Sequence, residues 1–186
     1  MEHIINKTVE ALRHGATVLY PTDTIWGLGC DARRHDAVER LYTIKGRDRS
    51  KSMLVLCSSD MVAEIPVAMQ ADSRPTTYIL PEEMWRPLLG NLVARNLPAA
   101  DGGLGIRVPR HDFCQQVIAH LGAPLVSTSA NLSGQPSPTC YADISDDVRR
   151  RVDFCVPPRP EFTNGEGQGS RIVKLYADGS QTVLRP

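Results

Sequence analysis

The sequence has no excess of either charge. Its 21 Lys and Arg residues balance 21 Asp and Glu residues, so the formal net charge at pH 7 is zero. Overall charge therefore gives no reason to expect bulk attraction to nucleic acid or to a membrane surface. Any site for an anionic ligand must be a local concentration of basic residues.

The sequence also lacks a cysteine pair at metal-binding spacing. The five cysteines are odd in number, widely spaced and free of any CxxC pair: Cys30, Cys57, Cys114, Cys140 and Cys155. This pattern indicates neither a zinc site nor a disulfide framework. No signal peptide is visible, and no apolar run approaches the length of a membrane span. We therefore expect a cytoplasmic protein with no membrane contact and no metal held by its own side chains.

The length and the order of elements indicate the fold class. A chain of 186 residues with 41% hydrophobic content favours a single domain over residues 1–186, although length alone does not exclude two lobes. Segments typical of strands alternate with segments typical of helices, and a hairpin signal stands near the end. We expect an α/β protein with a twisted mixed sheet flanked by helices.

The spacing of apolar residues predicts the individual elements. Helical spacing predicts helices over residues 5–13, 37–44, 58–70 and 113–121, the last capped by Asp112, and a short helix capped by Ser145. Short apolar runs predict strands over 17–20, 53–57, 74–80, 105–108, 124–126 and 152–156, and a hairpin of 170–175 with 181–184.

Two stretches are rich in proline and glycine. Residues 81–103, with three prolines and an apparently exposed Trp85, are predicted to be irregular, and one interpretation is a mobile cover over a site. Residues 157–169 are predicted to form a second loop, with its mobility left open.

A run of small polar residues follows the apolar start of the stretch PLVSTSANLSG at residues 124–134. Its hydroxyl and amide groups both donate and accept hydrogen bonds, which suits a polyanion or a polar small molecule. The alternative is an ordinary loop whose side chains satisfy their own backbone.

A second polar stretch, PTDTIWGLGC at residues 21–30, follows the first predicted strand and is predicted to be a loop. Ligands commonly bind beyond the carboxyl ends of strands in open α/β sheets. The spacing matches neither GxGxxG nor a Walker loop. The alternative is a turn around a buried Trp26.

The third notable stretch is basic. Residues 45–51 contain four cations within seven residues: Lys45, Arg47, Arg49 and Lys51. Such a run is usually a solvated helix end, but it can also clamp phosphate. The position between a helix and a strand favours the clamp. For the basic run 149–151 we favour a solvated helix terminus, and we interpret His111 and His120 as structural or surface residues.

Together these stretches resemble the YrdC-like family of threonylcarbamoyl-AMP synthases. The family marker is a Lys-x-Arg pair followed much later by Ser-x-Asn, found here as Lys45 with Arg47 and Ser129 with Asn131. The similarity extends over nearly the whole chain, to YPTDTIWGLG at residues 20–29, 77–80, 105–109, Ser170 and Arg185. Each motif alone is weak, but their order and separations are specific.

This resemblance implies a YrdC-like fold with a concave, positively charged face that holds ATP, L-threonine and bicarbonate. Family members are nucleotidyltransferases that form threonylcarbamoyl-adenylate and release pyrophosphate. Other proteins then transfer the threonylcarbamoyl group to an adenosine of certain tRNAs, and some relatives bind tRNA or double-stranded RNA. The chain resembles the short members, which lack an extra C-terminal domain.

The resemblance also implies roles for individual residues. Lys45 and Arg47 are the predicted catalytic residues, and ATP is expected at Lys45, Arg47, Lys51, Ser129, Asn131, Ser170 and Arg185. Mg²⁺ is expected to bridge phosphate oxygens. Threonine is expected at Thr22, Thr24, Thr77, Arg107 and Ser127, with the Arg107 guanidinium suited to a carboxylate. This hypothesis requires Arg47 and Asn131 to meet across one cavity.

The sequence differs from the family pattern at three places. Many members have Asn-Pro-Leu at residues 51–53, a histidine after the strand at 55–57, and Trp-Pro-Gly-Pro near 73–76, whereas this chain has KSM, VLC and SRPT. These differences are similar to the YciO-like branch. A second hypothesis is therefore an RNA-binding module that uses the same basic face without synthase activity.

Overall fold

The computed structural model describes residues 1–65, 74–160, 162 and 167–186. Its centre is a nine-stranded sheet, formed by β1 Val18–Tyr20, β2 Gly27–Gly29, β3 Leu54–Leu56, β4 Thr76–Leu80, β5 Leu104–Arg107, β6 Leu125–Ser129, β7 Phe154–Cys155, β8 Arg171–Leu175 and β9 Gln181–Arg185. The order across the sheet is β7-β1-β2-β6-β3-β5-β4-β8-β9. The sheet is therefore assembled largely from strands distant in sequence.

The sheet is mixed, as predicted. β1 with β7, β3 with β5, and β4 with β8 are parallel pairs, and the other neighbours are antiparallel. The terminal hairpin β8–β9 is confirmed. A parallel pair needs a crossover connection, and the chain between β3 and β5 returns through β4 and a helix.

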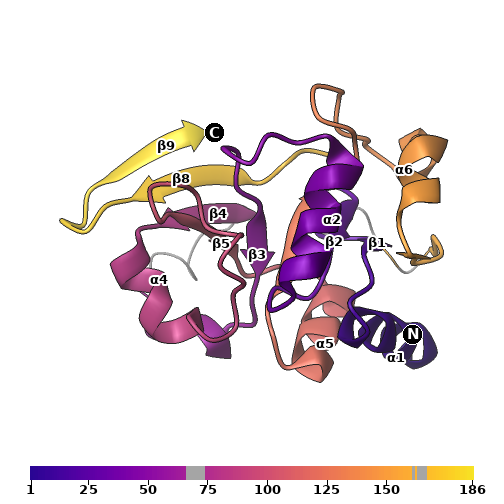
Figure 1. Ribbon diagram of the computed structural model, residues 1–186, viewed down its shortest axis with the longest axis horizontal. Helices are drawn as coiled ribbons and strands as arrows, with labels where there is room; N and C mark the ends of the chain where they lie inside the picture. The colour runs from indigo at the N-terminus through magenta and orange to yellow at the C-terminus, as the bar shows by residue number, and fades with distance from the viewer. Residues whose placement is uncertain (66–73, 161, 163–166) are drawn as a thin grey trace.

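Helices flank the sheet (Figure 1): α1 Glu2–Arg13, α2 His35–Lys45, α4 Glu82–Leu89, α5 Asp112–Leu121 and α6 Asp146–Arg151. α1 packs against α5 at the end that carries the N-terminus, while α4 lies at the other end, near the β8–β9 hairpin. The helices predicted around residues 5–13, 37–44 and 113–121 are confirmed. No helix in the described part of the chain is long and apolar enough to cross a membrane.

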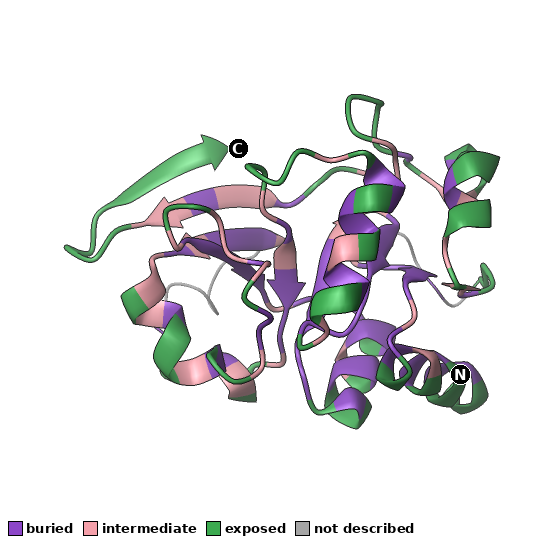
Figure 2. Cartoon of the chain, viewed as in Figure 1, coloured by how far each residue is buried: buried purple, intermediate pink, exposed green. Residues whose placement is uncertain are grey.

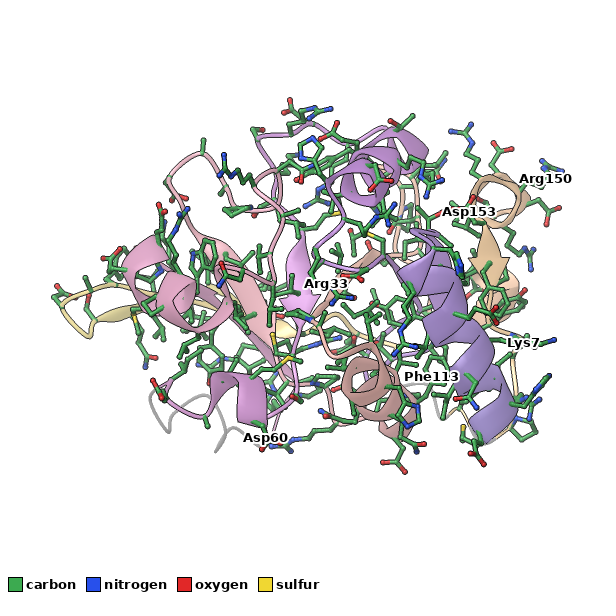
Figure 3. All side chains as sticks on the ribbon, turned by 60° about the horizontal axis from the view of Figure 1, so that its bottom comes forward. Lys7, Arg33, Asp60, Phe113, Arg150 and Asp153 are labelled. Atoms are coloured by element: carbon green, nitrogen blue, oxygen red, sulfur yellow. The ribbon has the colours of Figure 1, made fainter. Side chains whose placement is uncertain are left out.

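The core lies along the central strands, while β9 is exposed (Figure 2). Figure 3 contrasts Phe113, which is 1% exposed, with Arg150, whose side chain is 72% exposed and points away from the body of the protein. The Ser145 hydroxyl accepts a hydrogen bond from the Val148 amide and caps α6 as predicted. Residues 149–151 are the basic last turn of this helix, which confirms the solvated-terminus interpretation.

Some local predictions were wrong. β2 lies inside the stretch predicted as a loop, because its two glycines hide the strand pattern. The N-cap of α5 is His111 and not Asp112. Within residues 58–70 the structure describes a 3₁₀ turn, Asp60–Val62, whereas residues 66–73 lie outside the described residues.

The stretch 81–103 also differs from its prediction. It contains α4, with Pro87 inside the helix, and Trp85 is 2% exposed. The Trp85 indole N–H donates to the Gly102 carbonyl at 2.9 Å, which ties the helix to the turn before β5. Amphipathic packing of Trp85 and Leu89 outweighs the lost hydrogen bond at the proline.

Gly29 allows β2 to lie against β6. A Cβ atom at this position would stand 2.0 Å from the Val126 carbonyl oxygen and 2.8 Å from the Tyr20 ring. Such overlap cannot be relieved by rotating a flexible side chain, because one partner is backbone.

We expect Gly29→Ala to lower the free energy of unfolding by at least about 3 kcal/mol, because β2 and β6 must separate. Gly179→Ala is the control: Gly179 has a φ of 83° but open space around it, so only backbone strain of about 1–2 kcal/mol applies. Urea unfolding measures both. Equal losses in the two variants would contradict the close-approach argument.

Candidate functional site

A cavity of about 270 Å³ lies on one face of the sheet. Its floor consists of alternate residues of neighbouring strands, including Thr77 and Ile79 of β4, Gly105 and Arg107 of β5, and Ser127 and Ser129 of β6. Successive side chains of a strand point to opposite faces. The intervening residues of β4 and β5 are accordingly buried and apolar or aromatic: Tyr78 and Ile106. In β6 the intervening Thr128 also lines the cavity.

The strand register brings these residues into rows. Leu54 is paired with Gly105 on one side and with Ser127 on the other, and Gly105 is in turn paired with Ile79. Gly105 lacks a side chain, and a Cβ there would stand 3.1 Å from the Leu54 Cβ. The absence of a side chain at Gly105 therefore leaves space in the middle of the cavity floor, with polar groups around it.

The charge of the cavity is positive. Arg47, Arg107 and Arg185 line it, and among the described residues no Asp or Glu does. Burial lowers the pKa of Arg47, and burial together with the nearby Arg107 lowers the pKa of Arg185. Guanidinium groups favour oxyanions such as phosphate and carboxylate, because their planar fork of donors matches two oxygens.

Arg107 is fixed from behind by the loop after β1. Its Nη1 donates to the Thr24 hydroxyl at 2.9 Å, and its Nη2 lies 3.4 Å from a carboxylate oxygen of Asp23. Both charged side chains are almost fully buried, 4% exposed for Arg107 and 7% for Asp23. The Thr22 hydroxyl lies 3.0 Å from that of Thr24 and donates to the Ile25 carbonyl. The loop therefore sets the guanidinium rigidly at one end of the cavity.

Arg185 belongs to β9, the strand at the edge of the sheet. Its Nε donates to the Ser170 carbonyl at 2.8 Å, and the Ser170 hydroxyl lies 2.7 Å from that of Thr77. β8 thus links the exposed strand β9 to the buried strand β4 at the edge of the cavity.

Arg47 is held by the chain that follows it. Its Nε donates to the Lys51 carbonyl at 2.7 Å and its Nη2 to the Ser52 carbonyl at 2.9 Å. The Lys51 side chain itself is exposed and does not line the cavity. Arg49 is also exposed, and it pairs with Glu39. Of the four cations in the run 45–51, only Arg47 reaches the cavity wall.

Nine of the twelve predicted site residues line the cavity: Thr22, Thr24, Arg47, Thr77, Arg107, Ser127, Ser129, Ser170 and Arg185. The other three do not: Lys45, Lys51 and Asn131. The Lys45 ammonium donates to the Ser129 and Asn131 carbonyls at 2.5 and 2.6 Å, so Asn131 lies just behind the wall that Arg47 and Ser129 form. The Lys-x-Arg and Ser-x-Asn parts of the marker are therefore in contact, and the contact is between the Lys45 side chain and backbone carbonyls.

Sequence reasoning missed the apolar part of the cavity, notably Leu54, Ile79 and Ile172. A usable signal was the period of two along each strand. Ile79 stands two residues after Thr77, and Ile172 two after Ser170, so each shares a sheet face with a predicted site residue. No residue of 81–103 lines the cavity, so this segment does not cover it.

The differences from the family pattern fall partly on the cavity. Ser52 and Met53 line it, in the place where many members have Pro-Leu. Cys57 is buried in the core and does not line it. Ser73 lies outside the described residues.

The donor set does not fit a metal ion held by the protein. Among the described residues no group of three or more His, Cys, Asp or Glu side chains is placed to bind a metal, and the cavity has no acidic wall. Mg²⁺ prefers carboxylates and phosphate oxygens. Any Mg²⁺ in this cavity would therefore come as part of a magnesium–nucleotide substrate.

Fold and site together define an α/β protein with a basic, hydroxyl-lined cavity on its mixed sheet. A family model with the description "Telomere recombination", covering Sua5, YciO and YrdC, matches residues 10–186. The chain belongs to this Sua5/YciO/YrdC family. The resemblance seen in the sequence is thereby confirmed.

Named relatives and solved structures agree with this family assignment. A threonylcarbamoyl-AMP synthase from Xanthomonas campestris pv. campestris is 33% identical over 161 residues, which is 80% of this chain and 82% of the relative. The crystal structure of P. abyssi Sua5 complexed with L-threonine superposes with a TM-score of 0.79 at 26% identity, over 98% of this chain but 53% of that one. The chain thus spans about half of Sua5. E. coli YciO shares the fold, with a TM-score of 0.74 at 24% identity over 100% of this chain and 89% of YciO.

The buried Lys45 ammonium predicts a pH dependence of stability. Burial, with a contribution from Arg47, lowers the pKa of Lys45 from the ordinary 10.5 to about 8. Between these pH values the unfolded chain holds a proton that the folded protein has released. The free energy of unfolding therefore rises with pH in this window, by at most about 1.4 kcal/mol per pH unit.

Lys45→Met removes this contribution and leaves the other titrating groups in place. We expect the difference in unfolding free energy, wild type minus variant, to be constant from pH 6 to 7.5 and to rise from pH 8 to 10. Urea unfolding at a series of pH values measures it. A difference that stays constant up to pH 10 would show that the ammonium is not desolvated.

Proposed function

We propose that this protein is a threonylcarbamoyl-AMP synthase, a nucleotidyltransferase that forms threonylcarbamoyl-adenylate and pyrophosphate from L-threonine, bicarbonate and ATP. The observation that carries the proposal is a cavity in which three guanidinium groups meet hydroxyls from several strands, with no acidic side chain among the described residues that line it. The named synthase relatives and the threonine complex of Sua5 support it.

The reaction needs several anions in one place. The threonine amine attacks the carbon of bicarbonate, with loss of water, to give a carbamate. A carbamate oxygen then attacks the α-phosphorus of ATP, and the bond to pyrophosphate breaks. No covalent intermediate with the protein is required, so catalysis rests on positioning and on cations set in advance for the charge that develops on phosphoryl oxygens.

The nucleotide is assigned to the end of the cavity near α2 and β9. Arg47 and Arg185 would bind the phosphates, because both guanidinium groups already have their orientation fixed by backbone carbonyls. The Ser129 hydroxyl from β6 and the Ser170 hydroxyl would bind the adenylate. Mg²⁺ would enter with ATP and would partly neutralise the charge of the phosphates.

The amino acid is assigned to the end formed by the loop after β1. Arg107 would bind the threonine carboxylate, since it is fixed by Asp23 and Thr24 and its planar group matches two oxygens. The hydroxyls of Thr22, Thr24, Thr77 and Ser127 would surround the polar groups of the amino acid.

The product would serve tRNA modification. Threonylcarbamoyl-adenylate is a mixed anhydride that other proteins would use to modify an adenosine of tRNA, and direct contact with tRNA or double-stranded RNA on the basic face is part of this proposal. A cytoplasmic location agrees with five free cysteines, three of them buried.

The test is pyrophosphate release by the purified protein. We expect release that requires ATP, L-threonine and bicarbonate together, and formation of threonylcarbamoyl-adenylate detected by mass spectrometry. We expect Arg47→Met to lower kcat/KM for ATP by at least about 100-fold, because a preset cation is lost. Arg49→Met removes an equal charge two residues away from an exposed position outside the cavity, and it should retain activity.

The same pair of variants tests the RNA-binding hypothesis. A module that only attracts RNA through a basic face loses affinity in proportion to charge, so both variants should weaken salt-dependent RNA binding about equally. RNA binding of that kind, with no pyrophosphate release under any combination of substrates, would reject the synthase and favour the module.

Arg107 provides a separate test of the amino-acid end. Arg107→Lys keeps the charge but loses the planar fork, so we expect KM for threonine to rise about tenfold or more while KM for ATP changes little. Initial rates of pyrophosphate release measure both constants. A rise confined to KM for ATP would move Arg107 to the nucleotide end.

A further inference from the structure

Lys45, the last residue of α2, contacts the loop that follows β6, residues 130–135, through both its side chain and its backbone. The Lys45 ammonium donates to the Ser129 and Asn131 carbonyls at 2.5 and 2.6 Å. The Lys45 carbonyl accepts from the Ser133 amide at 2.8 Å. α2 stops here because Gly46 adopts a left-handed conformation, with a φ of 56°. Lys45 therefore closes the helix and the loop onto each other.

Asn131 continues the same arrangement inside the loop. Its Nδ2 donates to the Leu132 and Gln135 carbonyls at 2.9 and 2.7 Å, and its amide donates to the Ser129 carbonyl at 2.9 Å. Both side-chain donor bonds thus go to the backbone of the loop itself. The Ser129, Asn131, Leu132 and Gln135 carbonyls are all satisfied by this pair of side chains.

These contacts occupy the side-chain donors of Asn131 and two of the three donors of Lys45, while the buried Asn131 Oδ1 has no hydrogen-bond partner among the described residues. Lys45 is only 2% exposed, and neither Lys45 nor Asn131 lines the cavity. Their partners in the marker, Arg47 and Ser129, do line it. The ammonium directs two of its three donors at carbonyls, and hydrogen bonds to a charged group are stronger than neutral ones. If the ammonium turned from these carbonyls to a phosphate, the Ser129 and Asn131 carbonyls would lose their hydrogen bonds from Lys45.

We propose that Lys45 and Asn131 are positioning residues that build the loop behind Ser129, whereas Arg47 and Ser129 contact the substrate. This inference rests on the proposed function and refines it. It divides the four marker residues into two that form the wall and two that hold the wall in place.

The first experiment uses the free protein and needs no ligand. We measure amide hydrogen exchange in wild type, Lys45→Met and Arg47→Met. The amides of Ser133 and Gln135 are hydrogen-bonded in the loop. We expect them to exchange about tenfold faster in Lys45→Met, the equivalent of one charge-assisted hydrogen bond. In Arg47→Met they should exchange as in wild type. Unchanged exchange in Lys45→Met overturns the proposal.

The second experiment compares ATP with AMP by calorimetry. A residue that binds the outer phosphates loses more affinity for ATP than for AMP when it is removed, and we expect this of Arg47→Met. A positioning residue weakens both nucleotides by the same factor, about tenfold for Lys45→Met. Its turnover at saturating ATP should stay within about threefold of wild type, with the loss in KM. Loss selective for ATP in Lys45→Met overturns the proposal.

Asn131→Ala gives the same readouts if Lys45→Met does not fold, because Asn131 is partly exposed and its removal leaves the ammonium paired. We expect faster exchange at Gln135 and an equal loss for ATP and AMP. If wild type binds neither nucleotide, the proposed function fails, while the exchange experiment still decides whether Lys45 and Asn131 order the loop.

Discussion

The central position of β6 between β2 and β3 is the constraint on which the site depends. β6 is antiparallel to both neighbours, although it begins 96 residues after β2 ends and 69 residues after β3 ends. This pairing places Ser127 and Ser129 opposite Leu54 and Gly27. Gly29 makes the approach possible on one side. Without it, the polar end of β6 would be a loop far from Arg47 and Arg107.

Repulsion between the cations of the site destabilises the protein without a ligand and favours the binding of anions. Three guanidinium groups and the Lys45 ammonium lie in or beside one cavity, and Asp23 compensates only part of that charge. Backbone carbonyls or hydroxyls hold each cation, and Asp23 is the one carboxylate paired with any of these cations among the described residues. Carbonyls fix a cation without neutralising it, so the charge remains for a ligand. An acidic wall would stabilise the resting protein and weaken phosphate binding.

The family relationship and the geometry support each other at different levels. The relative named as a synthase matches 80% of the chain, and the Sua5 fold matches 98% of it. The geometry concerns single atoms, and it divides a motif that looks uniform in sequence. Lys45 and Arg47 are two residues apart, yet one faces backbone carbonyls and the other faces the cavity. The turn at Gly46 causes this split, because it ends the helix between them.

The sequence by itself determined the α/β class, the mixed sheet, most helices and nine of the residues that line the cavity, because local periodicity and short motifs carry that information. It did not determine β2, whose glycines conceal a strand, or α4, where Trp85 packs inward despite Pro87. Nor did it determine which marker residues reach the cavity. Only the tertiary structure decided that, because the direction of the Lys45 and Asn131 side chains depends on carbonyls brought together by pairing between distant strands.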